Sequence, residues 1–274
     1  MKFPMLWAVL VGLAGLSAHG DEYELYLLAG QSNMDGRGKA AKLSATQKKP
    51  IRNAIIFYRN PPTTTEGWKP LAPGFSVPPR FKGDLPSPTF GPELGFVTTL
   101  TESQPGRKFA LIKGSKGGSS LRVDWNPGEA GKPETQGPRY RDMIETMAQA
   151  RAALKNDGHT AILRGMIWHQ GESDAKQSTE NHEARLKRLI ARIREDTGAP
   201  HLPVVLGQVV DNGKRDRVRA AILNASKADP LVGFVSSEGT TTWDEGTHFD
   251  AGSQLVLGER FAEEMLQLLD GANK

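Results

Sequence analysis

One serine of the sequence stands where a nucleophile would be presented. Ser32 lies in the polar segment 30–36, directly after the apolar run 24–29 that is typical of a buried strand. A serine hydroxyl is a weak nucleophile until a histidine accepts its proton. His248 suits this role because it follows the last predicted strand and precedes the last predicted helix. The two residues predict acyl-transfer chemistry.

The histidine of such a site needs a carboxylate to hold its tautomer and to stabilise the cation that forms. We expect Glu245 to do this, since it lies three residues before His248 and reaches the other ring nitrogen within one turn. Asp244, one residue further away, is an alternative if the turn is bulged. Glu172 is a third carboxylate within the predicted site.

Fixed hydrogen-bond donors must also meet the oxyanion that develops during acyl transfer. The segment 114–120 follows a predicted strand, and its glycines let a backbone amide approach a substrate oxygen closely. We expect Gly118 to supply this amide, with Gly117 as the alternative. The side-chain amide of Gln170 and the backbone amide of Ser32 are the other predicted donors.

These residues lie in four blocks that resemble the SGNH hydrolases, and within them the sialate O-acetylesterase-like and acetylxylan-esterase-like carbohydrate esterases. The blocks are Gly30-Gln31-Ser32-Asn33-Met34, Lys116-Gly117-Gly118-Ser119-Ser120-Leu121 with Trp125, Trp168-His169-Gln170-Gly171-Glu172-Ser173-Asp174, and Glu245-Gly246-Thr247-His248-Phe249. The resemblance spans nearly the whole chain after residue 20.

The resemblance implies an α/β fold, a flavodoxin-like three-layer α/β/α sandwich with a central parallel sheet. It implies no metal and no organic cofactor, and it supports Gln170 in the place of the oxyanion asparagine of the wider superfamily. The family usually has aspartate three residues before the histidine, where this sequence has Glu245. His169 and Glu172 lack the second histidine of a zinc protease motif, so we assign no metal to them.

The expected function is the removal of O-acetyl groups from carbohydrates, either sialic acid or plant or algal polysaccharide esters, through an acyl-enzyme intermediate. A general or lipase-like esterase acting on lipid or aryl esters is the first alternative, and an inactive carbohydrate-binding homologue is the second. The polar character of the loops favours a sugar substrate. The loop residues considered for this are Arg37, Arg80, Arg122, Asp124 and Trp125. Trp168 ends an apolar run, which favours a core position over a sugar-stacking one.

Apolar runs typical of strands alternate along the chain with segments of helical period, as in a parallel sheet flanked by helices. The predicted strands are 24–29, 54–58, 109–113, 162–168, 204–210 and 232–236. The predicted helices are 91–102, 141–155, 181–195, 216–227 and 251–269. Two segments rich in proline and glycine, 60–88 and 126–138, are predicted to be irregular surface excursions.

The first residues indicate a compartment. Lys2, the apolar segment 5–16 and the small residues that follow have the layout of a secretory signal, so we expect a signal peptide over residues 1–20 and a single esterase domain over 21–274. A secreted or periplasmic protein without stable membrane insertion is expected. The chain has no cysteine, which excludes thiol catalysis and cysteine-ligated zinc. A net charge of +4, spread along the chain, does not favour nucleic acid as a partner.

Overall fold

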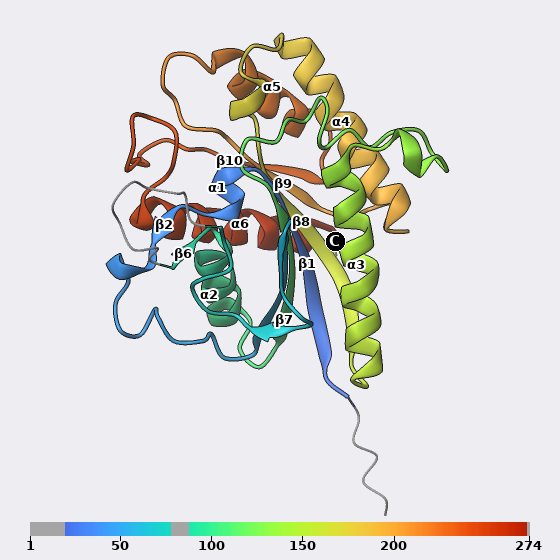
Figure 1. Ribbon diagram of the computed structural model, residues 1–274, viewed down its shortest axis with the longest axis vertical. Helices are drawn as coiled ribbons and strands as arrows, with labels where there is room; N and C mark the ends of the chain where they lie inside the picture. The colour runs from blue at the N-terminus through green and yellow to red at the C-terminus, as the bar shows by residue number, and fades with distance from the viewer. Residues whose placement is uncertain (1–19, 78–87, 273–274) are drawn as a thin grey trace, which may run out of the picture.

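The computed structural model describes residues 20–77 and 88–272 (Figure 1). The predicted signal peptide therefore lies outside the described residues except for Gly20, and so does the part of the proline-rich segment that holds Arg80. Within the described ranges, no helix combines the length and the apolar character that crossing a membrane requires.

A mostly parallel sheet forms the centre of the molecule, with β1 in its middle (Figure 1). Six parallel strands follow one another in the order β10-β9-β8-β1-β7-β3. Their bounds are β1 Glu22–Gly30, β3 Ala54–Asn60, β7 Lys108–Ser115, β8 Thr160–His169, β9 Val204–Gly207 and β10 Val232–Val235. All six predicted strands are present, although the fifth ends three residues earlier than predicted.

Four short strands of the described ranges pair antiparallel to their neighbours. β4 Thr63–Thr64 and β5 Lys69–Pro70 lie within the predicted proline-rich excursion 60–88, whereas β2 Gly38–Lys39 and β6 Thr89–Phe90 lie outside it. Both β4 and β5 pair with β3, and β2 pairs with β6 in a separate small sheet. Pro70 is tolerated because a proline without an N–H can occupy an edge strand. The described part of the excursion is therefore less irregular than the sequence predicts.

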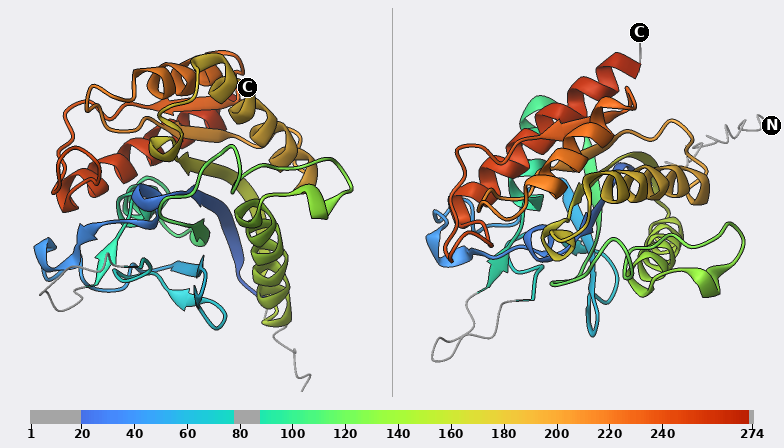
Figure 2. Two further views of the ribbon diagram at one scale, coloured as in Figure 1. Left: turned by 45° about the horizontal axis from the view of Figure 1, so that its top comes forward. Right: turned by 90° about the horizontal axis from the view of Figure 1, so that it is seen from above.

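Helices cover both faces of the sheet (Figures 1 and 2). They are α1 Ser32–Asp35, α2 Glu93–Ser103, α3 Pro138–Asn156, α4 Thr179–Asp196, α5 Asp216–Lys227 and α6 Ala251–Ala272. Side chains alternate across a strand, so Leu25 and Leu27 of β1 pack with α3, α4 and α5, while Tyr26 and Leu28 pack with α2 and α6. The two apolar cores confirm the predicted three-layer α/β/α sandwich.

The carboxyl ends of β1, β7 and β8 meet at one edge of the sheet. Gly30, the last residue of β1, pairs with Ser115 on one side and with His169 on the other. The chain crosses over β1 between β7 and β8, and ligands of open α/β sheets bind at such a switch point. At Gly30 a Cβ atom would lie 2.1 Å from the His169 carbonyl oxygen, so only glycine fits between the neighbouring strands.

Candidate active site

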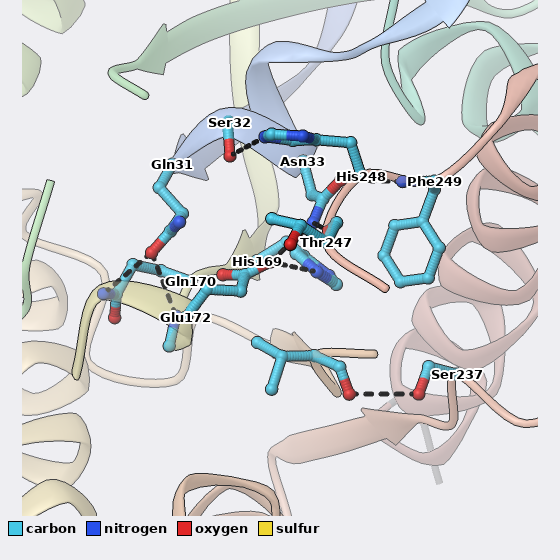
Figure 3. Close-up of polar contacts among 12 residues, drawn as sticks. Gln31, Ser32, Asn33, His169, Gln170, Glu172, Ser237, Thr247, His248 and Phe249 are labelled. Atoms are coloured by element: carbon cyan, nitrogen blue, oxygen red, sulfur yellow. Dashed lines mark hydrogen bonds and ion pairs between the residues drawn. The ribbon is translucent and has the colours of Figure 1, made fainter. Parts of the chain in front are cut away.

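Ser32 and His248 meet at the carboxyl edge of the sheet (Figure 3). Ser32 is the first residue of α1, the short helix that follows β1, and its side chain is buried. His248 lies in the long loop between β10 and α6. The Ser32 Oγ lies 3.1 Å from the His248 Nε2 atom, within hydrogen-bond distance. Residues 216 positions apart in the sequence are thus placed as a nucleophile and its base would be.

The carboxylate on the other ring nitrogen belongs to Asp244. Its Oδ2 lies 2.6 Å from the His248 Nδ1, and its Oδ1 accepts the backbone amides of His248 and Thr247 at 2.7 and 3.0 Å. Glu245 is exposed to solvent. The expectation for Glu245 therefore disagrees with the geometry, which places the alternative, Asp244, at the imidazole.

A tight turn explains this difference. The Gly246 amide donates to the Asp244 carbonyl at 2.6 Å, and Gly246 has a φ of 80°, in the left-handed region that favours glycine. The turn brings the side chain of Asp244 back over the loop. Burial raises the pKa of Asp244, but hydrogen bonds from His248 and Thr247 outweigh it, so that the pKa is lowered from its usual value. The carboxylate beside His248 is therefore ionised near neutral pH.

The glycine segment after β7 lies next to the serine. A Cβ atom at Gly117 would lie 3.7 Å from the Ser32 Cβ and 3.1 Å from the Arg37 Nη2, whereas one at Gly118 would meet open space. Among the residues that the structure describes, neither the Gly117 nor the Gly118 amide has a hydrogen-bond acceptor. The Gly117 amide, on a residue beside Ser32, and the amide of Ser32 itself, at the start of α1, can therefore donate to a substrate oxygen, and the Gly118 amide follows next in the chain.

Gln170 is fully buried and its side chain is occupied. Its Nε2 lies 2.6 Å from Asp174 Oδ2, 3.2 Å from the Ser119 carbonyl and 3.3 Å from Gln31 Oε1. Both of its amide hydrogens thus have acceptors inside the protein. Gln170 thus connects the loops after β1, β7 and β8 through hydrogen bonds. The structure differs here from the expectation that its side-chain amide donates to an oxyanion.

A family profile described as "Carbohydrate esterase, sialic acid-specific acetylesterase" matches residues 22–267. The chain belongs to this family. It is accordingly a carboxylic ester hydrolase of the carbohydrate esterase class, as the four sequence blocks predict.

Known relatives span most of the chain. The "Probable carbohydrate esterase At4g34215" of Arabidopsis thaliana is 24% identical over 259 residues, which cover 89% of this chain and 90% of the relative. The X-ray structure of that plant protein has a TM-score of 0.69 at 22% identity, covering 90% of this chain and 98% of its own. The crystal structure of NanS has a TM-score of 0.67 at 18% identity, covering 92% and 99%. XAC1771, a carbohydrate acetylesterase from Xanthomonas citri, has a TM-score of 0.64 at 19% identity, covering 90% and 56%. These structures share the fold described above.

In this esterase, Asn33 clamps the loop that carries His248 (Figure 3). Its Nδ2 donates to the Thr247 carbonyl at 2.9 Å, and its Oδ1 accepts the Phe249 amide at 3.1 Å. The same Nδ2 donates to Glu172 Oε1 at 2.5 Å. Glu172, the third carboxylate considered for His248, thus contacts Asn33 instead. The sequence analysis missed this role of Asn33, although the residue lies in the first sequence block.

His169 lies behind this clamp and is fully buried. Its Nε2 is 3.8 Å from the Glu172 Oε1, and its ring packs edge-on against Phe249 and Phe261. Burial lowers the pKa of His169, which keeps the ring neutral. In the part of the chain that the structure describes, no group of three or more histidine, cysteine, aspartate or glutamate residues is placed to hold a metal ion.

Asp35 anchors the other end of α1. It is fully buried, and its two carboxylate oxygens accept five hydrogen bonds of 2.6 to 3.0 Å. The donors are Tyr58 Oη, Asn60 Nδ2, Ser115 Oγ, Arg37 Nη1 and the Val77 amide. Burial and the Asp35 charge raise the pKa of Tyr58, so its hydroxyl stays a donor. The helix that begins with Ser32 is therefore held by a charge buried in the sheet edge.

Two of the residues considered for sugar contact lie in the interior. Trp125 is buried, donates from its Nε1 to Ser119 Oγ at 2.8 Å and packs edge-on against Trp168, which is also buried as expected. Arg37 is buried against Asp35. Arg122 is exposed. Trp125 and Arg37 thus stabilise the interior beside the site.

Proposed function

We propose that the protein is a serine O-acetylesterase that removes acetyl groups from carbohydrates. The observation that carries this proposal is the chain of contacts from Ser32 Oγ to His248 Nε2 at 3.1 Å and from His248 Nδ1 to Asp244 Oδ2 at 2.6 Å. This arrangement has the roles of a nucleophile, a base and an orienting carboxylate. The family to which the chain belongs makes an acetylated sugar the expected ester.

In the proposed reaction, Ser32 Oγ attacks the acetyl carbonyl carbon while its proton passes to His248 Nε2. The carbonyl oxygen becomes an oxyanion, which the amides of Ser32 and Gly117 or Gly118 stabilise. Its collapse breaks the bond to the sugar oxygen, which takes the proton from His248. A water molecule then gives a proton to His248 and attacks the acyl-serine. Acetate leaves, and the proton returns to the serine.

The family determines the class of substrate that we propose. The expected partner is an acetylated carbohydrate, and sialic acid or plant or algal polysaccharide esters are the candidates. Nucleic acid and a membrane are not expected partners. The signal-like layout of residues 1–20 supports a secreted or periplasmic location.

Acetate release from acetylated xylan, pectin and sialosides tests the proposal with the chain that begins at Asp21. Ser32→Ala is expected to lower kcat by about 10⁴-fold or more, because the nucleophile is lost. The matched control is Ser103→Ala at an exposed position at the end of α2, which should keep wild-type activity. Cleavage of long-chain esters alone would replace the substrate class, and unchanged acetate release from Ser32→Ala would refute the mechanism. No release by the wild-type protein would favour a carbohydrate-binding role.

A further inference from the structure

The indole of Trp243 lies flat against the imidazole of His248. The ring centroids are 5.7 Å apart and the ring planes differ by 11°, so the two rings are stacked and offset. The backbone explains the pairing, since the Trp243 amide donates to the His248 carbonyl at 3.1 Å and Thr242 forms a bridge with Phe249. Trp243 and His248 are thus paired at the base of the loop that carries Asp244.

The imidazole is held on two edges and on one face. Ser32 and Asp244 contact its two nitrogens in the plane of the ring. Contacts in the plane leave the ring free to tilt about the line that joins them. A stacked aromatic ring restricts that tilt, because aromatic pairs with centroids about 4.5 to 7 Å apart attract each other beyond the effect of their buried area.

We propose that Trp243 is a positioning residue for His248, which holds the plane of the imidazole and stabilises the imidazolium formed when the ring accepts the Ser32 proton. The inference rests on the proposed role of His248 as the base. The face of an indole carries partial negative charge and attracts a cation above it. Because the ring is neutral before proton transfer and positive after it, the stack favours the transition state over the ground state.

Other charged groups lie around the loop that carries Trp243 and His248. Asp244 contacts Nδ1 from the same loop, and Arg215, before α5, donates to the Gly246 carbonyl at 3.0 Å. Lys39 of β2 places its Nζ 5.9 Å from the centroid of Trp243. Glu172 reaches the loop through Asn33. The contacts of Asp244, Arg215 and Asn33 do not involve the indole and remain in a Trp243 variant, whereas the Lys39 contact is lost with the aromatic face.

The test compares Trp243→Leu, which keeps apolar cover over the imidazole, with Trp243→Phe, which keeps an aromatic face. In Trp243→Leu we expect the acidic limb of the pH profile of kcat/KM to move to lower pH by about half a unit. We also expect kcat to fall about 3- to 10-fold with KM changed by less than about twofold, because the stack acts in the transition state. Trp243→Phe should keep most of the wild-type profile.

Trp68→Leu is the matched control, because this indole packs on Phe57 and donates to the Ala150 carbonyl, away from the site. Its pH profile should equal that of the wild-type protein. Trp243→Met replaces Trp243→Leu if the latter does not fold. A Leu or Met variant with a wild-type profile and kcat, or a Phe variant equal to the Leu variant, overturns the inference. Activity that survives in Ser32→Ala overturns the proposed function instead, so the two failures are distinguishable.

Discussion

The two halves of the site are held by different means. Ser32 follows the central strand, and Gly30 before it is enclosed by β7 and β8. The α1 helix that Ser32 begins is buried throughout. His248 lies in a half-buried loop between β10 and α6, whose shape comes from hydrogen bonds within the loop and from Asn33 outside it. The sheet positions the nucleophile, and local loop contacts position the base.

This contrast implies different responses to substitution. A change on the nucleophile side disturbs buried groups and should lower stability. A change in the loop can leave the fold intact while it moves the imidazole away from Ser32. Separate measurements of stability and of kcat can therefore test whether the two halves are as independent as their contacts indicate.

Among the predictions that compare the two halves of the site, the largest expected effect distinguishes the two neighbouring carboxylates of the loop. Asp244→Asn should lower kcat by about 10³- to 10⁴-fold, because a neutral amide cannot stabilise the imidazolium and favours the wrong tautomer. Glu245→Gln, at the adjacent exposed position, should change kcat by less than about twofold. Steady-state kinetics on an acetyl ester measures both. The opposite order of effects would show that Glu245 orients His248 in solution.

The difference between these two carboxylates also shows which parts of the site the sequence can predict. Ser32 and the glycine segment 114–120 each follow a predicted strand, and the strand order brings the ends of these strands together at one edge of the sheet. The apolar runs that predict β1, β7 and β8 are long and buried on both faces, so their pattern is strong. Whether Asp244 or Glu245 reaches His248 depends on the path of a tight turn. That path is set by the hydrogen bond of the Gly246 amide and by the backbone amides that donate to Asp244. A periodic sequence pattern does not predict such hydrogen bonds.

The roles of Asn33 and Trp243 were missed for a related reason. Asn33 was noted as part of the serine block, but its partners are 214 and 216 positions away in the sequence. Trp243 directly precedes Asp244, but its ring stacks on His248 because the backbones of Trp243 and His248 are hydrogen-bonded to each other. Contacts of this kind depend on the path of a loop, which residue types and spacing leave open.

The second prediction concerns the buried charge on the nucleophile side. Asp35→Asn should lower the free energy of unfolding by about 3 kcal/mol, because it leaves the Arg37 guanidinium buried without its anion. The matched control is Asp142→Asn, since Asp142 forms ion pairs with Arg59 and Arg139 at a partly exposed position and should cost less than about 1 kcal/mol. Urea unfolding measures both. Equal stabilities would show that Asp35 does not anchor α1.

The third prediction tests the clamp that joins the two halves. Asn33→Ala removes the contacts to the Thr247 carbonyl and the Phe249 amide, so the base should lose its fixed position. We expect kcat to fall by about 10- to 100-fold, because small misplacements of catalytic groups are costly. Asn212→Ala is the control, since Asn212 contacts the same loop only at the Gly246 carbonyl, at 3.3 Å. If both variants lose the same activity, the clamp has no special role.

The smallest expected effect is a loss of stability at acidic pH, caused by His182, whose neighbour Asp174 contacts Gln170 near the nucleophile. Burial lowers the pKa of His182 in α4 to about 4, and Asp174, which accepts from Gln170, opposes this shift. The unfolded chain therefore binds a proton at His182 below pH 6.5 while the folded protein stays neutral there until about pH 4. The contribution of His182 to stability is thus present above pH 6.5 and is lost as the pH falls, by about 1 to 2 kcal/mol between pH 6.5 and 5. His182→Leu should flatten this part of the unfolding profile, whereas His201→Gln, at an exposed position, should not. If the slope survives in His182→Leu, the acid sensitivity belongs to another group. Protonation of His182 then does not affect Asp174 and Gln170.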